Sequence, residues 1–261
     1  LWAQCDSIYV ALAVLAIYLA LDGRPVTSVL FFTLSFGFKL QAVFLLPVMV
    51  VLWLKGKYKL WHFLLFPVFY VLLVLPAVAL GKPFLETLTL YASQTGSIGD
   101  GLNYNSPSVY AFFQYDPSVT DLAAASRMGI IAAFVFMSAI LVVCAIKRRG
   151  LTNGVILAVS VLFAVGIPFL LPHMHDRYFF AADVLTVVMA YAYVKYSAAA
   201  PLTQFASLLG YHAYLEMRYL LLMDHGARAL IVVLMLGIVL FIELLSARSD
   251  TCSADTVTDT E

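Results

Sequence analysis

The stretch MGIIAAFVFMSAILVVCAI at residues 128–146 decides the fold, because it contains no charged side chain and is long enough to cross a bilayer. The basic turn Lys147-Arg148-Arg149 follows it, and a second apolar run starts directly afterwards at Leu151. Over the whole chain 63% of residues are hydrophobic and 11% are charged. Soluble proteins have about half and about a quarter. These proportions predict an all-α polytopic membrane protein.

Charge and cysteine usage exclude several classes of protein. Fifteen basic residues balance fifteen acidic ones, so the chain lacks the charge excess of a nucleic-acid binder. Cys5, Cys144 and Cys252 lie far apart, which argues against a disulfide framework, a CxxC redox motif and a zinc site. No Walker A, dinucleotide-binding, zincin or lipase motif occurs. The chain starts at Leu1 rather than at a methionine, and we expect an amino-terminal part to be missing.

The apolar runs predict about seven to nine membrane helices within one helical domain at residues 1–246. Residues 25–54 would form a helix too long for one crossing, and Lys39 with Gln41 interrupts them. We therefore expect two short helices that meet near residues 36–41. Residues 200–223 either cross the membrane or lie in its interface. The clear spans are residues 60–80, 128–146, 151–171, 178–194 and 229–245, with a shorter one at 7–21 and a disordered polar tail at 247–261.

Basic clusters set the expected orientation, because positive charge favours the cytoplasmic side. The lysines at positions 55, 57 and 59 mark one internal loop, and residues 147–149 mark another. Residues 81–126 and 172–177 are then external. If residues 25–54 cross twice, Asp6 and Lys39 also reach the external face. The polar features that are hardest to explain structurally would then gather on one side of the membrane.

The segment PHMHDRYFFAAD at residues 172–183 is the richest in chemistry. Arg177 can hold a phosphate with two parallel hydrogen bonds, and His175 can donate to it or carry a proton. We expect a helix that starts near Arg177 to direct its amide groups to the same anion. His173 and Tyr178 are candidate substrate contacts, although an interfacial loop anchored among lipid headgroups would have a similar composition. At its depth Asp183 should face protein or water, and a structural pairing, for example with Lys39, and a catalytic role fit it equally well.

Two further groups are candidates for binding a phosphorylated sugar. Lys39 presents a compact charge suited to phosphate, and Gln41 can bond a sugar hydroxyl. The alternative for Lys39 is a charge that extends to water at a helix break. Trp2, Gln4 and Asp6 offer the aromatic face, amide and carboxylate that sugar recognition uses, a composition that an interfacial aromatic belt also produces.

The external segment at residues 81–126 is long for a connector, and it contains Tyr104 and Asn105. Long segments of this kind are often functional, and the Gly and Ser content of residues 93–101 suits a mobile lid. We therefore include Tyr104 and Asn105 among the candidate substrate-binding residues.

Four motifs together resemble the bacterial membrane glycosyltransferases related to the GPI-anchor mannosyltransferases, which belong to the GT-C superfamily. They are WAQCDSIY at residues 2–9, FKLQAVFLLP at 38–47, YNSPS at 104–108 and PHMHDRYFF at 172–180. The family pattern Lys-x-Gln-x-x-x-x-x-Pro matches Lys39, Gln41 and Pro47. Its Met-His-Glu-Arg-Tyr pattern matches residues 174–178, with Asp176 in place of the glutamate.

The resemblance implies a GT-C-like transmembrane helix bundle in a bacterial plasma membrane, with its active site outside. It implies transfer of a sugar, mannose by family name, from a polyprenyl-phosphate donor to a glycan, lipid or protein acceptor. Because Lys39, His175 and Arg177 are expected on the same membrane face, we assign the donor phosphate to them. Asp6 and Asp176 are candidate catalytic residues that would help to bind the sugar or a metal. The main catalytic base of such enzymes would lie upstream of this sequence. No metal ligand can be identified, so the cofactor stays open, a divalent metal included.

Two other functions fit the same composition. A transporter or lipid-linked-sugar permease would line its path with buried charges, and polar residues spread through several spans would favour it. The third is a non-catalytic fragment or subunit, which consumption of lipid-linked sugar would exclude.

Overall fold

The computed structural model describes residues 5–94, 101–113 and 121–255. Within these residues the chain is all-α apart from one two-residue pairing of strands, and it has eleven α-helices. It divides into two compact units, Leu1–Gly101 and Leu102–Glu261. The boundary lies inside the segment expected to be an external loop, and the single domain expected at residues 1–246 stays a prediction.

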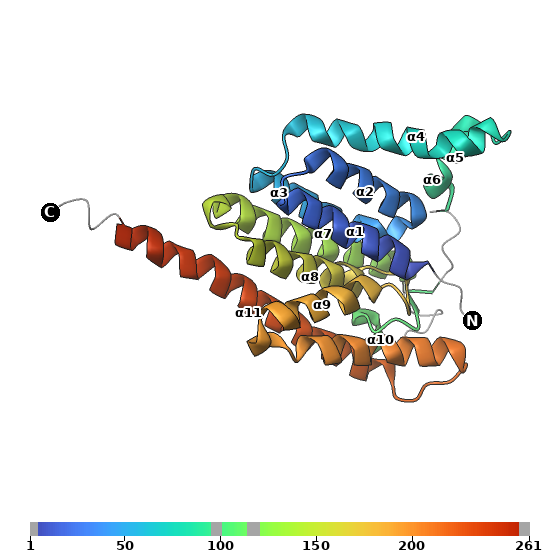
Figure 1. Cartoon of the computed structure of the whole chain (residues 1–261). Helices are drawn as coiled ribbons and strands as arrows, with labels where there is room; N and C mark the ends of the chain where they lie inside the picture. The colour runs from blue at the N-terminus through green and yellow to red at the C-terminus, as the bar shows by residue number, and fades with distance from the viewer. Residues whose placement is uncertain (1–4, 95–100, 114–120, 256–261) are drawn as a thin grey trace. The chain divides into compact units, whose positions relative to one another are not determined.

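In the first unit, α1 and α2 lie side by side and antiparallel (Figure 1). Gly23 makes the turn between them with φ of 82°, a left-handed conformation that residues with a side chain rarely adopt. The Ser28 hydroxyl donates to the Ala16 carbonyl at 2.5 Å, and Ser35 Oγ donates to the Tyr9 carbonyl at 2.6 Å. The helices and short 3-10 segments of this unit are α1 (Asp6–Leu21), α2 (Pro25–Phe38), η1 (Leu40–Leu45), α3 (Leu46–Leu54), η2 (Leu60–Leu64), α4 (Leu65–Ala79), α5 (Phe84–Leu88) and α6 (Leu90–Gln94).

The predicted break within residues 25–54 is confirmed. α2 ends at Phe38, Lys39 is extended with φ of −158° and ψ of 131°, and η1 leads into α3. Pro47 stands in the first turn of α3, where its missing amide hydrogen leaves no hydrogen bond unmade. The break places the Lys39 side chain at the end of a helix rather than in the middle of one.

The second unit is built around α8, which is buried along most of its length. α8 contacts α7, α9 and α11, and α10 packs between α9 and α11. The Asp121 side chain caps α7 by accepting from the Ala124 amide at 2.9 Å, and Thr152 caps α8 in the same way. The elements are β1 (Asn103–Tyr104), η4 (Val109–Phe112), α7 (Leu122–Ile146), η5 (Arg148–Gly150), α8 (Asn153–Leu170), β2 (Met174–His175), α9 (Phe180–Ala192), η6 (Val194–Tyr196), α10 (Ala199–Leu215) and α11 (Met223–Asp255).

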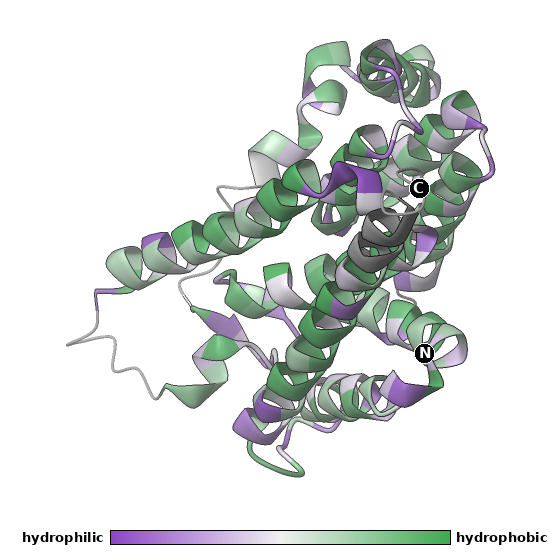
Figure 2. Ribbon diagram, turned by 90° about the vertical axis from the view of Figure 1, so that its left-hand side faces the viewer, coloured by the Kyte–Doolittle hydropathy of each residue, from purple (hydrophilic) through white to green (hydrophobic). Residues whose placement is uncertain are grey.

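Four of the described helices are long and apolar enough to cross a membrane, which is what an integral membrane protein requires. Figure 2 shows mostly hydrophobic residues along the helices, with hydrophilic residues mainly at turns and helix ends. Four shorter apolar helices accompany them. The total of seven to nine membrane helices therefore stays a prediction. The long helices are Leu60–Ala79, Leu122–Ile146, Asn153–Leu170 and Met223–Ala247, and the shorter ones are Asp6–Leu21, Pro25–Phe38, Leu40–Leu54 and Phe180–Ala192.

Two boundaries differ from the sequence expectations. The helix expected to start near Arg177 starts at Phe180, because residues 176–179 form a turn in which the Phe180 amide donates to the Arg177 carbonyl. α11 continues to Asp255, into the tail expected to be disordered, as a helix propagates more easily than it nucleates. The polar residues 256–261 lie outside the described part of the chain.

Candidate functional site

In the second unit a short parallel pairing of strands joins two of the segments selected from the sequence. β1 pairs with β2, with Asn103 opposite Met174 and Tyr104 opposite His175. The Asp176 amide donates to the Tyr104 carbonyl at 3.1 Å, which extends the pairing by one residue. Residues about seventy positions apart in the sequence therefore meet at one place. We call residues 102–108 together with residues 172–179 the paired-loop site.

Aromatic contacts hold the His175 ring within this site. The Tyr104 ring stacks on it with a centroid distance of 4.8 Å and an interplanar angle of 14°. The Tyr178 ring approaches its edge at 5.3 Å. Both arrangements are favourable for rings that carry a quadrupole. The contacts orient an imidazole that is only partly buried, so it can meet a ligand.

The charged pair Asp176 and Arg177 occupies the turn after β2. Asp176 is 1% exposed and packs against α10 at Gly210, where a Cβ would lie 3.2 Å from the Asp176 Cβ and 2.9 Å from the Asn105 carbonyl oxygen. Only glycine permits this approach. The neighbouring Arg177 is partly buried, and its Nε has no hydrogen-bond partner among the described residues. A buried guanidinium donor without a partner favours an anion as its ligand.

Asn105 is held in a conformation that few residues adopt. Its φ is 55°, in the left-handed region where asparagine is tolerated better than most residues. The Tyr219 hydroxyl donates to its Oδ1 at 2.6 Å. Beside it, the Asn103 side chain bonds both the amide and the carbonyl of Ser106 at 2.9 Å. The loop is thus fixed by side chains, and Tyr219 is a contact that the sequence did not suggest.

His173 is the other strained residue of the site, with φ of 60°. Its Nε2 lies 3.2 Å from the Ser126 hydroxyl, near the start of α7. Its amide donates to the Leu102 carbonyl at 2.8 Å. His173 therefore ties α7 to the paired-loop site. Ser126 could not be predicted as its partner because the two residues are far apart in the chain.

Asp183 does not have the partner suggested from the sequence. Its Oδ1 accepts a hydrogen bond from the Ser207 hydroxyl of α10 at 2.9 Å, and Tyr211 is a second hydrogen-bond partner. Lys39 forms an ion pair with Asp6 instead. The carboxylate is satisfied between α9 and α10, since Ser207 and Tyr211 lie one turn apart on α10 and so share one face of it.

In the first unit, Lys39 forms a nearly buried ion pair with Asp6. The distance from Nζ to Oδ1 is 2.5 Å, and the side chains are 12% and 7% exposed. The Lys39 ammonium also lies 5.9 Å from the centroid of the Tyr9 ring. Gln41 is near the same helix break, and its Oε1 is buried with no hydrogen-bond partner among the described residues. The ammonium thus contacts a protein carboxylate, and a role in binding phosphate stays a prediction.

The two groups of candidates lie in different units. The second unit brings together Tyr104, Asn105, His173, His175, Asp176, Arg177 and Tyr178, and the first unit brings together Asp6 and Lys39. Trp2 and Gln4 lie outside the described residues. A single external face that holds both groups stays a prediction. Among the described residues, no three His, Cys, Asp or Glu side chains are grouped as a metal site would require.

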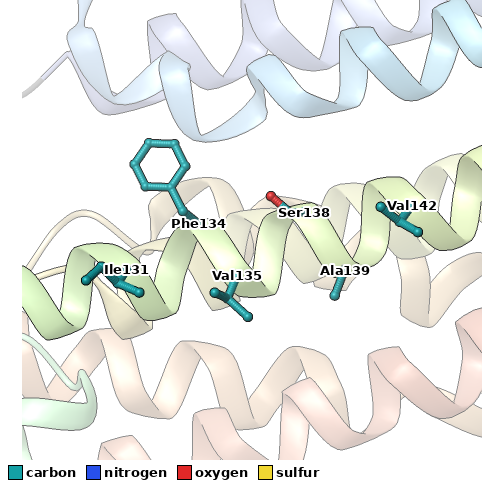
Figure 3. A pocket seen from close by; sticks show the side chains of 6 residues that line it. All are labelled: Ile131, Phe134, Val135, Ser138, Ala139 and Val142. Atoms are coloured by element: carbon teal, nitrogen blue, oxygen red, sulfur yellow. The ribbon is translucent and has the colours of Figure 1, made fainter.

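A shallow apolar groove of about 500 Å³ lies elsewhere, along α7 (Figure 3). Ser138 is its one polar lining residue. Such a lining is what a helix needs where it faces lipid or another helix. The groove has no charged or titratable side chain that would perform chemistry. Its lining residues are Ile131, Phe134, Val135, Ser138, Ala139 and Val142.

In comparisons with known proteins, no family model, no curated protein and no solved structure matches the chain.

Proposed function

We propose that the chain carries the donor-phosphate site of a membrane glycosyltransferase of the GT-C type. The enzyme would transfer a sugar, mannose by the family resemblance, from a polyprenyl-phosphate donor to an acceptor on the external face of a bacterial plasma membrane. The observation that carries the proposal is the pairing of residues 102–104 with residues 173–176, because it assembles the candidate residues of two distant segments into one site.

The chemistry of the site suits a phosphate ester. In the transfer the acceptor hydroxyl oxygen bonds to the anomeric carbon, the bond from that carbon to the phosphate oxygen breaks, and the polyprenyl phosphate leaves with the bonding electrons. Negative charge then grows on the phosphate. Arg177 can meet that charge with its fork of donors, and His175 can donate a further hydrogen bond.

Asp6 and Asp176 take supporting roles in this proposal. Asp176 is 1% exposed within the paired-loop site, and Asp6 is bonded to Lys39. Both carboxylates are hidden from an incoming hydroxyl by burial, and Asp6 instead holds the Lys39 ammonium. The carboxylate that takes the acceptor proton is left to another part of the enzyme, as the family resemblance implies.

The test compares variants of Arg177 in the complete gene product, with a radiolabelled polyprenyl-phosphate mannose as donor. Arg177→Ala should lower the transfer rate by at least about 10²-fold, the usual effect of removing a donor to developing negative charge. Arg177→Lys keeps the charge but loses the fork, so it should recover only part of the rate. Arg148→Ala, in the basic turn after α7, is the matched control and should leave the rate unchanged. Full turnover of Arg177→Ala would refute the assignment.

A further inference from the structure

The connection between α10 and α11 exposes an unusual run of apolar side chains. Residues 216–222 are not helical, and Glu216 and Arg218 are their only charged residues. A turn that faces water is normally polar, and a run of exposed apolar residues calls for a function. The exposed residues are Met217 at 86%, Tyr219 at 58%, Leu220 at 66%, Leu221 at 45% and Leu222 at 69%.

The connection is nevertheless fixed at its base. Met223 is buried in a small cluster with Leu209 and Ala213. The His212 ring nitrogen Nδ1 lies 3.1 Å from the Arg218 carbonyl oxygen, and the His225 amide donates to the Leu222 carbonyl at 3.1 Å. The apolar side chains are thus presented outward by a chain whose backbone is hydrogen-bonded.

The same connection contacts the paired-loop site. The Tyr219 hydroxyl donates to Asn105 Oδ1, and Asn105 is the residue with φ of 55°. At the start of α11, a Cβ on Gly226 would lie 2.9 Å from the Cβ of Pro107, so glycine is needed for this close packing. A displacement of residues 217–222 would therefore act directly on Asn105.

The position of α11 indicates which surroundings the exposed apolar side chains of residues 217–222 have. Residues Met223–Ala247 are long and apolar enough to cross a membrane, and the connection ends where this helix starts. A segment at that position lies at the membrane surface. Tyrosine and arginine are favoured there, and leucine side chains enter the outer hydrocarbon layer.

We propose that residues 217–222 lie in the interface of the bilayer that α11 crosses, and that Tyr219 transmits this position to Asn105. The occupant of the apolar surface is lipid rather than a second protein. Tyr219 is a positioning residue, and its effect on the reaction rests on the proposed function. The contact of residues 217–222 with the bilayer does not depend on the proposed function.

The membrane contact is tested in vesicles that contain phospholipids with a nitroxide quencher in the upper part of the acyl chain, a depth that the leucine side chains of an interfacial segment reach. An environment-sensitive fluorophore is attached to Leu221→Cys in a chain whose native cysteines are replaced. The control places the same label on Arg148→Cys, in a basic turn that favours water. Label at position 221 should be quenched several-fold more strongly than label at position 148. Equal quenching at the two positions would overturn the proposal. Weak quenching at position 221 that increases when the protein is diluted in lipid would also overturn it, because it indicates that a second copy of the chain covers this position.

The link to the site is tested with Tyr219→Phe, Asn105→Ala and the double variant. In thermal unfolding, the double variant should be no less stable than the less stable single variant, because the two changes remove one shared bond. Additive losses would overturn the link, and this measurement needs no enzymatic activity.

With the donor as substrate, Tyr219→Phe should raise KM about twofold to tenfold with kcat and quenching unchanged. The control, Tyr191→Phe at a 93% exposed tyrosine, should leave both KM and stability unchanged. An unchanged KM in an active Tyr219→Phe enzyme would remove its role in donor binding, whereas absence of transfer by the wild type would refute the proposed function alone.

Discussion

The Lys39 ammonium lies 2.5 Å from the Asp6 carboxylate, and both side chains are almost fully buried. The pair joins the start of α1 to the break after α2. A charge removed from water in this way is stable only while its partner is present, because each ion has lost most of its hydration.

Removal of one partner should therefore destabilise the first unit strongly. Lys39→Met leaves the Asp6 carboxylate buried and unpaired, and we expect a loss of about 3–5 kcal/mol in the free energy of unfolding. The double variant Asp6→Leu with Lys39→Met should recover most of that loss, since an apolar pair needs no hydration. Denaturant unfolding in detergent measures both changes. If the single variant is as stable as the wild type, the ion pair does not hold α1 to the helix break.

Gly210 provides a test of how the paired-loop site is built. A methyl group at this position meets the Asn105 carbonyl and Asp176, so Gly210→Ala should shift the loop and destabilise the protein by about 1–3 kcal/mol. The matched control is Gly150→Ala, where the nearest atom, Leu245 Cδ2, lies at an ordinary 3.7 Å. Its stability should change little. Thermal unfolding of the two variants compares them directly, and equal stability would contradict the close packing of α10 on this loop.

Tyr91 connects α6 to the carboxyl end of α2. Its hydroxyl donates to the Phe36 carbonyl at 2.9 Å and lies 3.0 Å from the Gly37 carbonyl. Tyr91→Phe removes this bond and keeps the ring contact with Phe36, so we expect a loss of about 0.5–1.5 kcal/mol. Chemical denaturation measures it, and an unchanged midpoint would show that the hydroxyl contributes nothing.

The same tyrosine predicts a dependence on alkaline pH. Burial, with smaller contributions from Tyr70 and Cys5, raises the pKa of Tyr91 to about 12 from its ordinary value of 10.0. A raised pKa means that the fold favours the neutral phenol. Its contribution to stability is complete below pH 10 and is lost as the pH rises towards 12. Difference absorbance of phenolate between the wild type and Tyr91→Phe should show this late titration, and a transition centred near pH 10 would contradict it.

Much of the helical arrangement could be predicted from the sequence because its causes are local. The break after Phe38 follows from a charged residue inside a run too long for one crossing, with Pro47 ready to start the next helix. Apolar length alone predicts α7 and α8. α9 starts at Phe180, three residues after the start expected near Arg177, since turn residues 176–179 have the same composition as a helix start.

The partners of the site residues could be predicted only in part. The paired-loop site combines two segments that the sequence had already selected, because both are polar and lie between apolar runs. The bonds of Asn105 with Tyr219 and of Asp183 with Ser207 could not be predicted, since helix packing brings each pair together from distant positions. The suggested pairing of Asp183 with Lys39 is not found: Lys39 pairs with Asp6 inside the first unit, and Asp183 bonds Ser207 inside the second.

The most direct test of the central claim follows the polyprenyl-phosphate donor in vesicles that contain the complete gene product. The donor is labelled in both its sugar and its lipid. The account predicts that sugar leaves the lipid and appears on an added acceptor, that free polyprenyl phosphate accumulates in equal amount, and that Arg177→Ala abolishes both. Donor that crosses the bilayer with its sugar still attached, and no release of polyprenyl phosphate, would contradict the account and identify a permease instead.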